Sequence, residues 1–379
     1  MKVLILYDCV YPESIGGVEH RNHHLALALA RRGHEVRLSG WATHARSPAP
    51  GVEVTILPGQ GPIRDGEGAG RRRLRHALSW ARAMTSVDLA WPDVVETANI
   101  PHAHLFPLAT RCRIARRPLV VTWHEVWGRY WRDYAGLPWR AFAFAERLAA
   151  RLGTVATAVS PLTAERLARL RPRGLAPVIP NGIPVAAVAA AAAGQSAGAP
   201  LVYAGRLLAD KRLDLLLRAL ALLPAVEGRW LAVVGDGPER SRLEALAGEL
   251  GIAGRVDFLG RLPEPEDVWR RLGAARLAVQ PSRREGFGLF PLEAMAAGLP
   301  VVYCSSPDSA VSSLVRDGIE GVEVAPEPEA LAAVLARLVR DDDARARMAT
   351  AAVARAADHD WDAIAARLEG VFAGALASR

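Results

Sequence analysis

The chain has 379 residues, of which 51% are hydrophobic and 23% charged, so its composition is that of a globular protein and not of a disordered one. Its length exceeds what one hydrophobic core usually supports, which predicts two domains. The net charge of +7 suits anionic partners such as phosphates or an acidic membrane surface, but no clustered motif points to nucleic acid.

The sequence predicts neither a membrane span nor a signal peptide. No long apolar run is free of charge, and the N-terminus becomes acidic at Asp8, too soon for a signal peptide. The three cysteines, Cys9, Cys112 and Cys304, are scattered and odd in number, which favours reduced thiols. We therefore expect a soluble, cytoplasmic protein.

The first half alternates short β-rich apolar runs with helical patterns, which is typical of a parallel sheet in an α/β domain. A helix over residues 18–32 ends at Gly33, and helices over 138–152 and 161–170 begin with proline, which suits a first helical position. A further helix over 71–84 is basic and amphipathic. The predicted strands cover residues 3–7, 35–39, 52–57, 93–97, 118–122, 154–159 and 177–180.

The pattern breaks near residues 181–184, and the alanine-rich segment that follows, 186–199, suits either a linker or a short helix. The alternation then restarts. We place the domain boundaries so that the first domain covers 1–183, the second 184–358 and a closing helical segment 359–379. The second domain has predicted strands over 201–205, 230–235, 256–260, 277–281, 301–304 and 321–324, and helices over 212–223, 239–249, 264–272, 291–297 and 328–339.

Both domains are predicted to be Rossmann-like, doubly wound sheets. In such sheets ligands bind beyond the carboxyl ends of the strands, so two facing domains would create one cleft. The motifs described below all follow predicted strands and are therefore expected to line that cleft.

Two carboxylates separated by seven residues, Glu285 and Glu293, form the sharpest motif. Between them, Gly286 and Gly288 permit positive φ and a close backbone approach to a ligand, and Pro291 is expected to open a helix. Backbone N–H groups at a helix start attract anions, while carboxylates accept hydrogen bonds from pairs of hydroxyls. The motif therefore suits a ligand with two sugar rings, such as a donor sugar and a ribose.

Two cations, Arg206 and Lys211, follow a strand that ends at Gly205, with Lys211 at the expected start of a helix. Fixed cations can stabilise the charge that develops on a departing diphosphate without a metal. Either cation alone would suit an ordinary surface, and it is the combination with the glutamates that favours a site.

Three weaker signals remain open between a structural and a ligand-binding role. Gly235-Asp236-Gly237-Pro238 is a tight strand-to-helix turn that lacks the last glycine of a dinucleotide fingerprint. Gly16-Gly17 precedes a helix and suits either a plain turn or a phosphate cradle. His124 follows a strand end, where a histidine can be structural or can hydrogen-bond a ligand.

The sequence resembles family 4 glycosyltransferases, which have the GT-B fold, in six motifs that cover nearly the whole chain. Each motif alone is weak, but six in the correct order are specific. In chain order they are Gly16-Gly17, His124, Gly205-Arg206 with Lys211, Gly235-Asp236-Gly237-Pro238, Phe258-Leu259-Gly260, and Glu285 with Glu293.

The resemblance implies an acceptor-binding first domain, a nucleotide-sugar-binding second domain and a last helix, from Trp361, that packs back on the first. Arg206 and Lys211 would bind the donor diphosphate, Glu285 the donor sugar and Glu293 the ribose, and residues 258–261 would hold the base. The implied catalytic residues are His124, Arg206, Lys211 and Glu285. The implied donor-binding residues are Gly16, Gly17, Gly205, Gly235, Gly237, Leu259, Gly260, Arg261, Gly286, Phe287, Gly288, Leu289 and Glu293.

The resemblance further implies transfer with retention of the anomeric configuration, without a cofactor and without a metal. The donor would be a nucleotide diphosphate-sugar, with UDP favoured over GDP or ADP, and the acceptor a small molecule, glycan or lipid. The alternatives are a sugar-nucleotide epimerase of the same fold and a non-catalytic nucleotide-sugar-binding protein. A pyridoxal phosphorylase is disfavoured, because Lys2 and Lys211 are the only lysines. The oligomeric state stays open.

Several other features admit two interpretations. His20 and His24 have a spacing that can bind zinc, but we favour a polar helix face. Asp341-Asp342-Asp343 is interpreted as a helix N-cap and not as a metal site. Residues 71–75 with Leu78 and Trp80 suit a basic surface helix or a peripheral contact with an anionic membrane. The aromatic residues after His124 suit core packing or acceptor stacking; they are Trp127, Tyr130, Trp131, Tyr134 and Trp139.

Overall fold

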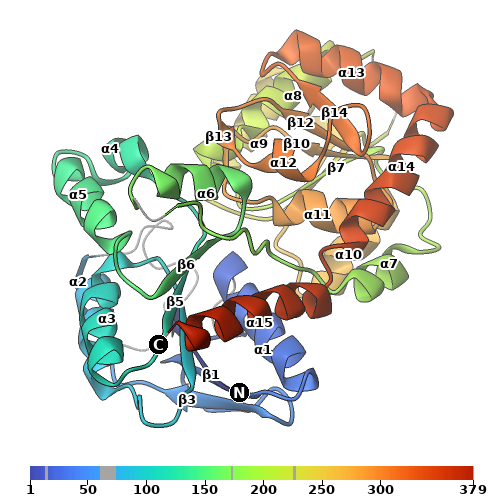
Figure 1. Ribbon diagram of the computed structural model, residues 1–379. Coiled ribbons are helices and arrows are strands. Elements are labelled where there is room, and N and C mark those ends of the chain that lie inside the picture. Colours follow the sequence, from blue (N-terminus) through green and yellow to red (C-terminus); the bar gives the residue numbers. More distant parts are fainter. Residues whose placement is uncertain (13–15, 60–73, 172–173, 225–227, 379) are drawn as a thin grey trace. The chain divides into compact units, whose positions relative to one another are not determined.

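The computed structural model describes residues 1–12, 16–59, 74–171, 174–224 and 228–378 (Figure 1). The chain divides into two compact units: unit 1 consists of Met1–Gly182 with Trp361–Arg379, and unit 2 of Ile183–Asp360. The predicted boundaries, 183/184 and 358/359, lie beside these limits. No helix of the described ranges is long and apolar enough to cross a membrane.

Unit 1 contains a six-stranded parallel sheet with the order β3-β2-β1-β4-β5-β6. Its strands are β1 (Lys2–Cys9), β2 (Glu35–Trp41), β3 (Val52–Ile56), β4 (Val94–Ala98), β5 (Leu119–Trp123) and β6 (Val155–Ala158). Its helices are α1 (Gly17–Arg31), α2 (Leu74–Ala83), α3 (Leu105–Ile114), α4 (Trp131–Ala135), α5 (Trp139–Ala149), α6 (Pro161–Ala168) and α15 (Trp361–Ala377).

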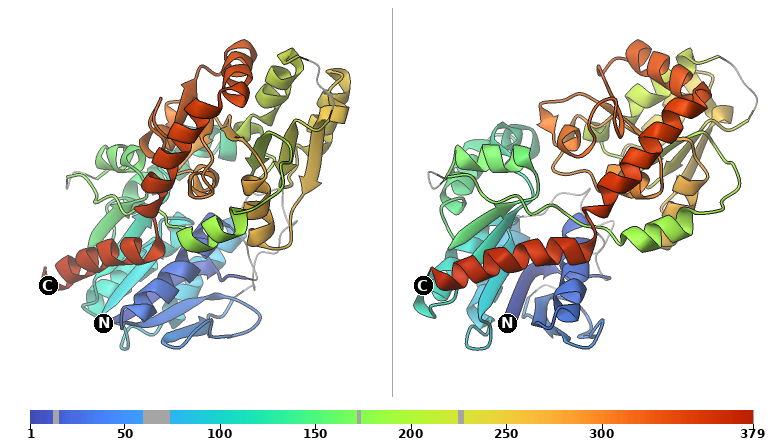
Figure 2. Two further views of the ribbon diagram at one scale, coloured as in Figure 1. Left: turned by 90° about the vertical axis from the view of Figure 1, so that its right-hand side faces the viewer. Right: turned by 45° about the vertical axis from the view of Figure 1, so that its right-hand side comes forward.

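Strand alternation gives the sheet of unit 1 two apolar faces. On β1, Val3 and Ile5 pack in the cluster that contains α1 and α15, whereas Leu4 and Leu6 pack in the cluster that contains α2 and α3. Because a strand buried on both faces is a continuous apolar run, β1 could be identified from the sequence. Helix α15 contacts α1, and the views show the two side by side (Figure 2).

Unit 2 repeats the same architecture. Its parallel sheet has the order β14-β12-β10-β7-β8-β9, and its first, second and third strands in sequence therefore occupy the same relative places as those of unit 1. Its strands are β7 (Leu201–Ala204), β8 (Leu231–Val234), β9 (Val256–Gly260), β10 (Leu277–Gln280), β12 (Val301–Cys304) and β14 (Gly321–Val324), with a separate two-stranded ladder of β11 (Arg284–Glu285) and β13 (Asp308–Ser309).

Two groups of helices accompany this sheet. Helix α8 contacts both α9 and α13, while α10 and α11 contact each other and α7, and α11 also contacts α14. The bounds are α7 (Val185–Ala192), α8 (Leu213–Leu222), α9 (Arg240–Glu249), α10 (Pro265–Gly273), α11 (Leu289–Ala296), α12 (Val311–Leu314), α13 (Pro328–Arg340) and α14 (Asp342–Ala357). The six strands predicted for unit 2 are confirmed, and the alanine-rich segment left open by the sequence contains α7.

Two expectations about elements differ from the structure. Residues 177–180 do not form a strand but only a bridge between Ala158 and Val178, since Pro177 and Pro180 cannot donate to a ladder. Helices α3, α4 and α12 were not predicted; in α3, Pro107 near its start and its weak apolar periodicity conceal the helix.

Candidate active site

An ion pair stands where the strand order of unit 2 reverses. The segment after β7 carries Lys211, and the segment after the adjacent strand β10 carries Glu285; the Lys211 Nζ and Glu285 Oε2 atoms are 2.5 Å apart. Both side chains are about four-fifths buried, with 20% and 18% of their surface exposed. In open α/β sheets this reversal point is where ligands bind. Two residues predicted for the donor site are thus in contact.

Glu285 is held by its backbone and by one amide. It lies in the short strand β11, beside Ser309 of β13. The Gln280 Nε2 atom donates hydrogen bonds to Glu285 Oε2 and to Ser282 Oγ, both at 3.0 Å. Oε2 therefore accepts from a cation and an amide, and Oε1 has no hydrogen bond among the described residues.

Lys211 is a fixed cation. Burial alone would lower its pKa, but Glu285, Tyr203 and Asp210 outweigh burial and raise the pKa above its usual value. The residue ends a single 3-10 turn, and α8 begins only at Leu213, after Arg212 in the left-handed region. Lys211 therefore precedes the helix and does not start it.

Arg206 contrasts with Lys211. Its side chain is exposed, and no ion pair holds its guanidinium within the described ranges. Its backbone oxygen accepts a hydrogen bond from the hydroxyl of the buried Tyr203, at 3.2 Å, which ties down the turn after β7. The exposed guanidinium is thus carried by an anchored turn.

The glycines of unit 2 let two strand-end turns touch. A Cβ on Gly235 would collide with the backbone oxygen of Gly205, and one on Gly237 with that of Leu207. Gly235 has φ 125°, and its N–H donates to the Gly260 oxygen at 2.7 Å. The close approach of protein backbone thus accounts for both glycines. This is the structural one of the two roles that the sequence left open for the motif. Leu259 and Arg261 flank Gly260 at the end of β9.

The start of α11 differs from the expectation. The helix begins at Leu289, after Gly288 with φ 107°, so Pro291 lies inside its first turn and Glu293 in its second. Phe287 is buried, Gly286 half-buried, and Glu293 partly exposed. Burial raises the pKa of Glu293 to about 7, opposed by a hydrogen bond from Trp269.

The paired glycines of unit 1 stand where the sequence expects them, with Gly16 as the N-cap of α1 and Gly17 as its first residue. The carboxylate of Glu19 lies over Gly16, since a Cβ built there would be 2.5 Å from Glu19 Oε2. The N-terminal turn of α1 therefore already faces a carboxylate.

His124 is anchored through its backbone. Its N–H donates to Asn99 Oδ1 at 3.1 Å, and its oxygen accepts from Thr163 Oγ1 at 3.4 Å. Burial, and secondarily the charge of Arg21, lower the pKa of the imidazole to about 3. The ring is therefore neutral at physiological pH, and its buried Nε2 has no hydrogen-bond partner among the residues that the structure describes.

The aromatic residues after His124 divide into core and surface. Trp131 is buried and stacks on Phe142 at 5.2 Å, whereas Trp127, Tyr130 and Tyr134 are half-buried and contact one another. The buried Glu146 carboxylate accepts hydrogen bonds from the backbone N–H groups of residues 127 and 128, at 2.7 and 2.8 Å. The loop that presents the half-buried rings is thus pinned to α5.

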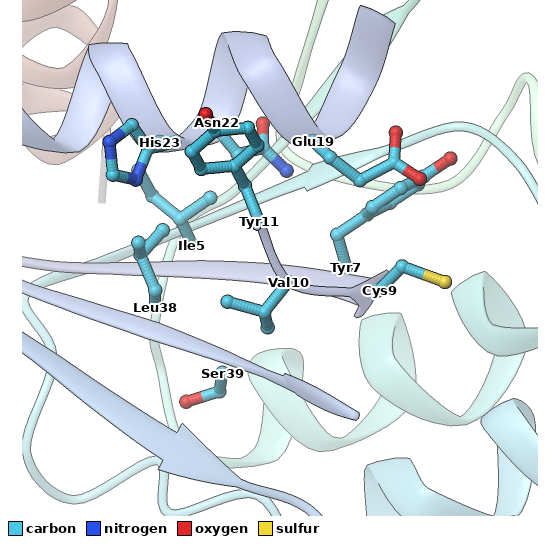
Figure 3. A pocket seen from close by; sticks show the side chains of 10 residues that line it. All are labelled: Ile5, Tyr7, Cys9, Val10, Tyr11, Glu19, Asn22, His23, Leu38 and Ser39. Atoms are coloured by element: carbon cyan, nitrogen blue, oxygen red, sulfur yellow. The ribbon is translucent and has the colours of Figure 1, made fainter. Parts of the chain in front are cut away.

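The histidines of α1 form part of an aromatic cluster. Tyr11 points toward α1 beside a small pocket that His23 also lines (Figure 3). The Tyr11 ring lies 4.7 Å from the rings of His20 and His23. His24 stacks on Trp361, with ring centroids 5.8 Å apart. No group of three or more His, Cys, Asp or Glu side chains among the described residues is placed to hold a metal ion.

The structure bears on two surface interpretations. Asp341 Oδ1 accepts a hydrogen bond from the Ala344 N–H at 2.9 Å, which confirms an N-cap. Trp80 is fully buried against Trp41, so it is unavailable to a membrane, although Leu78 is 58% exposed. Residues 71–73 lie outside the described ranges.

Sequence reasoning missed several side chains that contact these residues or lie near them. Gln280 and Tyr203 support Glu285 and the Arg206 turn, and Trp269 donates to Glu293 at 3.1 Å. In unit 1, the buried Arg21 lies 3.9 Å from Glu96. None belongs to a contiguous motif, so only a polar residue ending an apolar strand, as in Gln280, could have signalled its role.

Two family models and several known proteins match this chain. The family model described as glycosyltransferase family 4 matches residues 15–187, and that described as glycosyl transferases group 1 matches residues 197–355. The chain is 39% identical to a D-inositol 3-phosphate glycosyltransferase of Thermobispora bispora, over 46% of this chain and 43% of the relative. That alignment spans less than half of the relative's length. A glycogen synthase of Mycobacterium tuberculosis is 30% identical over 99% of this chain and 95% of its own.

Solved structures show the same fold. Sucrose-phosphate synthase from Thermosynechococcus elongatus matches with a TM-score of 0.83 and 22% identity, over 100% of both chains. Anabaena HepE in complex with UDP and glucose matches with a TM-score of 0.74 and 23% identity, over 98% of this chain and 99% of its own. The predicted GT-B fold is confirmed.

Proposed function

The chain belongs to glycosyltransferase family 4, and from this premise we propose that it transfers a hexose-type sugar from a nucleotide diphosphate-sugar, with retention of configuration. UDP is the favoured nucleotide, since Anabaena HepE was solved with UDP and glucose. The acceptor is a small molecule, a glycan or a lipid that offers a hydroxyl group.

The observation that carries the proposal is the contact between Lys211 and Glu285 where the strand order reverses. Lys211 stays charged at any physiological pH and is held in place, as a group that stabilises a phosphate must be. Glu285 Oε1 can accept a hydrogen bond from a sugar hydroxyl while Oε2 stays bound to Lys211. One ion pair thus provides for both the diphosphate and the sugar.

The reaction breaks the bond between the sugar's anomeric carbon and the diphosphate, whose oxygen takes the electron pair. Lys211 and Arg206 stabilise the negative charge that develops there, and no resident metal is required. The acceptor hydroxyl attacks from the same face, and its proton passes to the departing phosphate oxygen. Glu285 positions the donor sugar and forms no covalent bond.

The remaining predicted residues complete the donor site. Glu293 accepts the ribose hydroxyls, and residues 258–261 border the base. Within unit 1, the neutral imidazole of His124 suits a hydrogen bond to a sugar hydroxyl, and Gly17, which has no side chain, suits a phosphate that approaches the backbone. A neutral imidazole suits a hydroxyl because it can donate from one nitrogen and accept at the other.

Alanine substitution at Lys211 and at Glu285 tests the proposal. Each change should lower transfer from UDP-glucose, or from the sugar nucleotide that a thermal-shift panel selects, by about two to three orders of magnitude. Arg218→Ala is the matched control, because Arg218 is an exposed cation of α8 and should leave the rate unchanged. Circular dichroism verifies that each variant is folded.

Full activity in either variant would contradict the assigned roles. A non-catalytic binding protein would bind the donor without transfer or hydrolysis, and Glu285→Ala would then alter binding alone. Product analysis by NMR decides the stereochemistry: an inverted anomeric centre would exclude the same-face route.

A further inference from the structure

A tryptophan outside every predicted motif contacts the carboxylate proposed for the ribose. Trp269 lies in α10, is 5% exposed, and donates its indole Nε1–H to Glu293 Oε1 at 3.1 Å. We infer that Trp269 is a positioning residue that orients the Glu293 carboxylate to receive the ribose hydroxyls of the donor. This inference rests on the proposed function, because it concerns the same donor site.

The packing of α10 fixes the indole. Helix α10 contacts α7 and α11, and its charged residues Asp267 and Arg270 form an ion pair with each other on an exposed surface. A buried indole N–H needs an acceptor, and Glu293 Oε1 is its hydrogen-bond partner. Oε1 is used in this way, and Glu293 Oε2 has no hydrogen bond within the described ranges. Oε2 is therefore available to a ligand.

The same contact bears on the charge of Glu293. Burial raises the pKa of this carboxyl to about 7, the Trp269 hydrogen bond pulls it downward, and no charged side chain contributes. Helix α7 consists of alanine and valine only, and Trp269 is the polar contact from α10. Without the indole N–H, the carboxyl would hold its proton to higher pH.

The protonation state matters for a ribose. A charged carboxylate accepts hydrogen bonds from two hydroxyls at once, whereas a protonated one loses part of that capacity. Donor affinity should therefore rise as pH rises through about 7 in the native protein. Loss of the indole N–H should move that rise to higher pH.

The test is UDP binding by calorimetry between pH 6 and 9 for Trp269→Phe, with Trp230→Phe as the control. Trp230 also belongs to unit 2, but it directly precedes β8. It therefore lies at the amino end of that strand, opposite the carboxyl end where the donor site is proposed. We expect Trp269→Phe to weaken binding about 10-fold at pH 7, which is the lower end of the effect of one hydrogen bond to a charged group. At pH 9 the deficit should shrink, and kcat at saturating donor should change little while KM rises.

Unchanged affinity and an unchanged pH midpoint in folded Trp269→Phe would overturn the inference. Glu293→Gln distinguishes an error in the proposed donor site from an error in the positioning role of Trp269. This variant should weaken UDP binding and abolish its pH dependence. If Glu293→Gln binds UDP normally, the proposed donor site itself is wrong; if only Trp269→Phe is normal, the positioning role alone is wrong.

A second measurement covers the case in which Trp269→Phe fails to fold. In native protein labelled with ¹⁵N-tryptophan, one indole N–H resonance should titrate near pH 7 and move when UDP is added. The titration of that resonance should vanish in Glu293→Gln, which identifies it without a Trp269 variant. If no indole resonance titrates near neutral pH or responds to UDP, the inference is wrong.

Discussion

The two sheets have the same strand order, and each carries an ion pair across the point where that order reverses. In unit 1, Arg21 of α1 faces Glu96 of β4 at 3.9 Å, with 1% and 2% of the side chains exposed. In unit 2, Lys211 faces Glu285 at 2.5 Å, with 20% and 18% exposed. The same topological position thus holds a fully buried pair in one unit and a partly accessible pair in the other.

The difference in exposure separates two uses of charge. Burial lowers the pKa of Arg21 and raises that of Glu96, so both charges are costly where they stand. Lys211 shows the opposite shift, because its anionic neighbours outweigh burial. An ion pair that water and a ligand can reach, such as Lys211–Glu285, suits a role in the reaction. The sealed pair, Arg21–Glu96, is closed to both and has a structural role.

The largest effect should come from breaking the sealed pair. Arg21→Met leaves the Glu96 carboxylate buried without a cation, which should cost about 3 kcal/mol of unfolding free energy. Combining it with Glu96→Gln should recover most of that loss, because the amide oxygen can still accept the hydrogen bond from Thr122. Urea unfolding of the single and double variants measures the coupling, and additive losses would show that the two charges do not interact.

The backbone contact of unit 2 gives the next largest effect. Gly235→Ala would push a Cβ into the Gly205 oxygen at φ 125°, and should cost about 2 kcal/mol and weaken UDP binding. Gly248→Ala is the control, since Gly248 lies in α9 with nothing within 4 Å and should be neutral or slightly stabilising. Equal melting temperatures for the two variants would contradict the close approach of the turns.

These two features mark where sequence reasoning ends. The strands could be predicted, because buried parallel strands such as Val3–Leu6 are continuous apolar runs, and Lys211 and Glu285 could be selected because each stands in a motif after such a run. The contact of Gly235 with Gly205 and the pairing of Arg21 with Glu96 could not, because they join residues that only tertiary packing brings together.

The start of α11 is a smaller case of the same limit. Pro291 is a strong local signal for a first helical position, but the helix begins earlier, at Leu289, because Gly288 at φ 107° supplies the N-cap conformation. Trp269 was missed for a different reason: as one tryptophan in an amphipathic helix it resembles any core residue, and its partner Glu293 lies on another helix.

As the pH falls, His124 of unit 1 and Glu293 of unit 2 should change the stability of their units in opposite directions. His124 has a pKa of about 3 when folded and 6.5 ordinarily, so between these values only the unfolded chain binds the proton, and unit 1 loses stability as pH falls below 6.5. Glu293 has a pKa of about 7 when folded and 4.5 ordinarily, so the folded chain binds the proton and unit 2 gains stability as pH falls from 7. Between the two pKa values, each contribution amounts to about 1.4 kcal/mol per pH unit.

Hydrogen exchange followed by mass spectrometry at pH 7 and pH 5, corrected for intrinsic exchange rates, resolves the two responses. Protection should fall in β5 and β6 and rise in α10 and α11. His124→Gln should reduce the acid response of unit 1, and Glu293→Gln that of unit 2. Parallel loss of protection in both units would contradict the opposite shifts.

The smallest expected effect concerns metal removal. If Arg206 and Lys211 together neutralise the departing diphosphate, EDTA should leave the initial rate within error, because both charges are part of the chain. Lys211→Ala with added Mn²⁺ sharpens the test: a metal that replaced the lost cation would restore part of the rate in the variant and none in the native protein. Loss of native activity in EDTA, with recovery in Mn²⁺, would instead mean that the Lys211–Glu285 pair does not act alone. The difference in exposure between this pair and Arg21–Glu96 would then not by itself account for the chemistry.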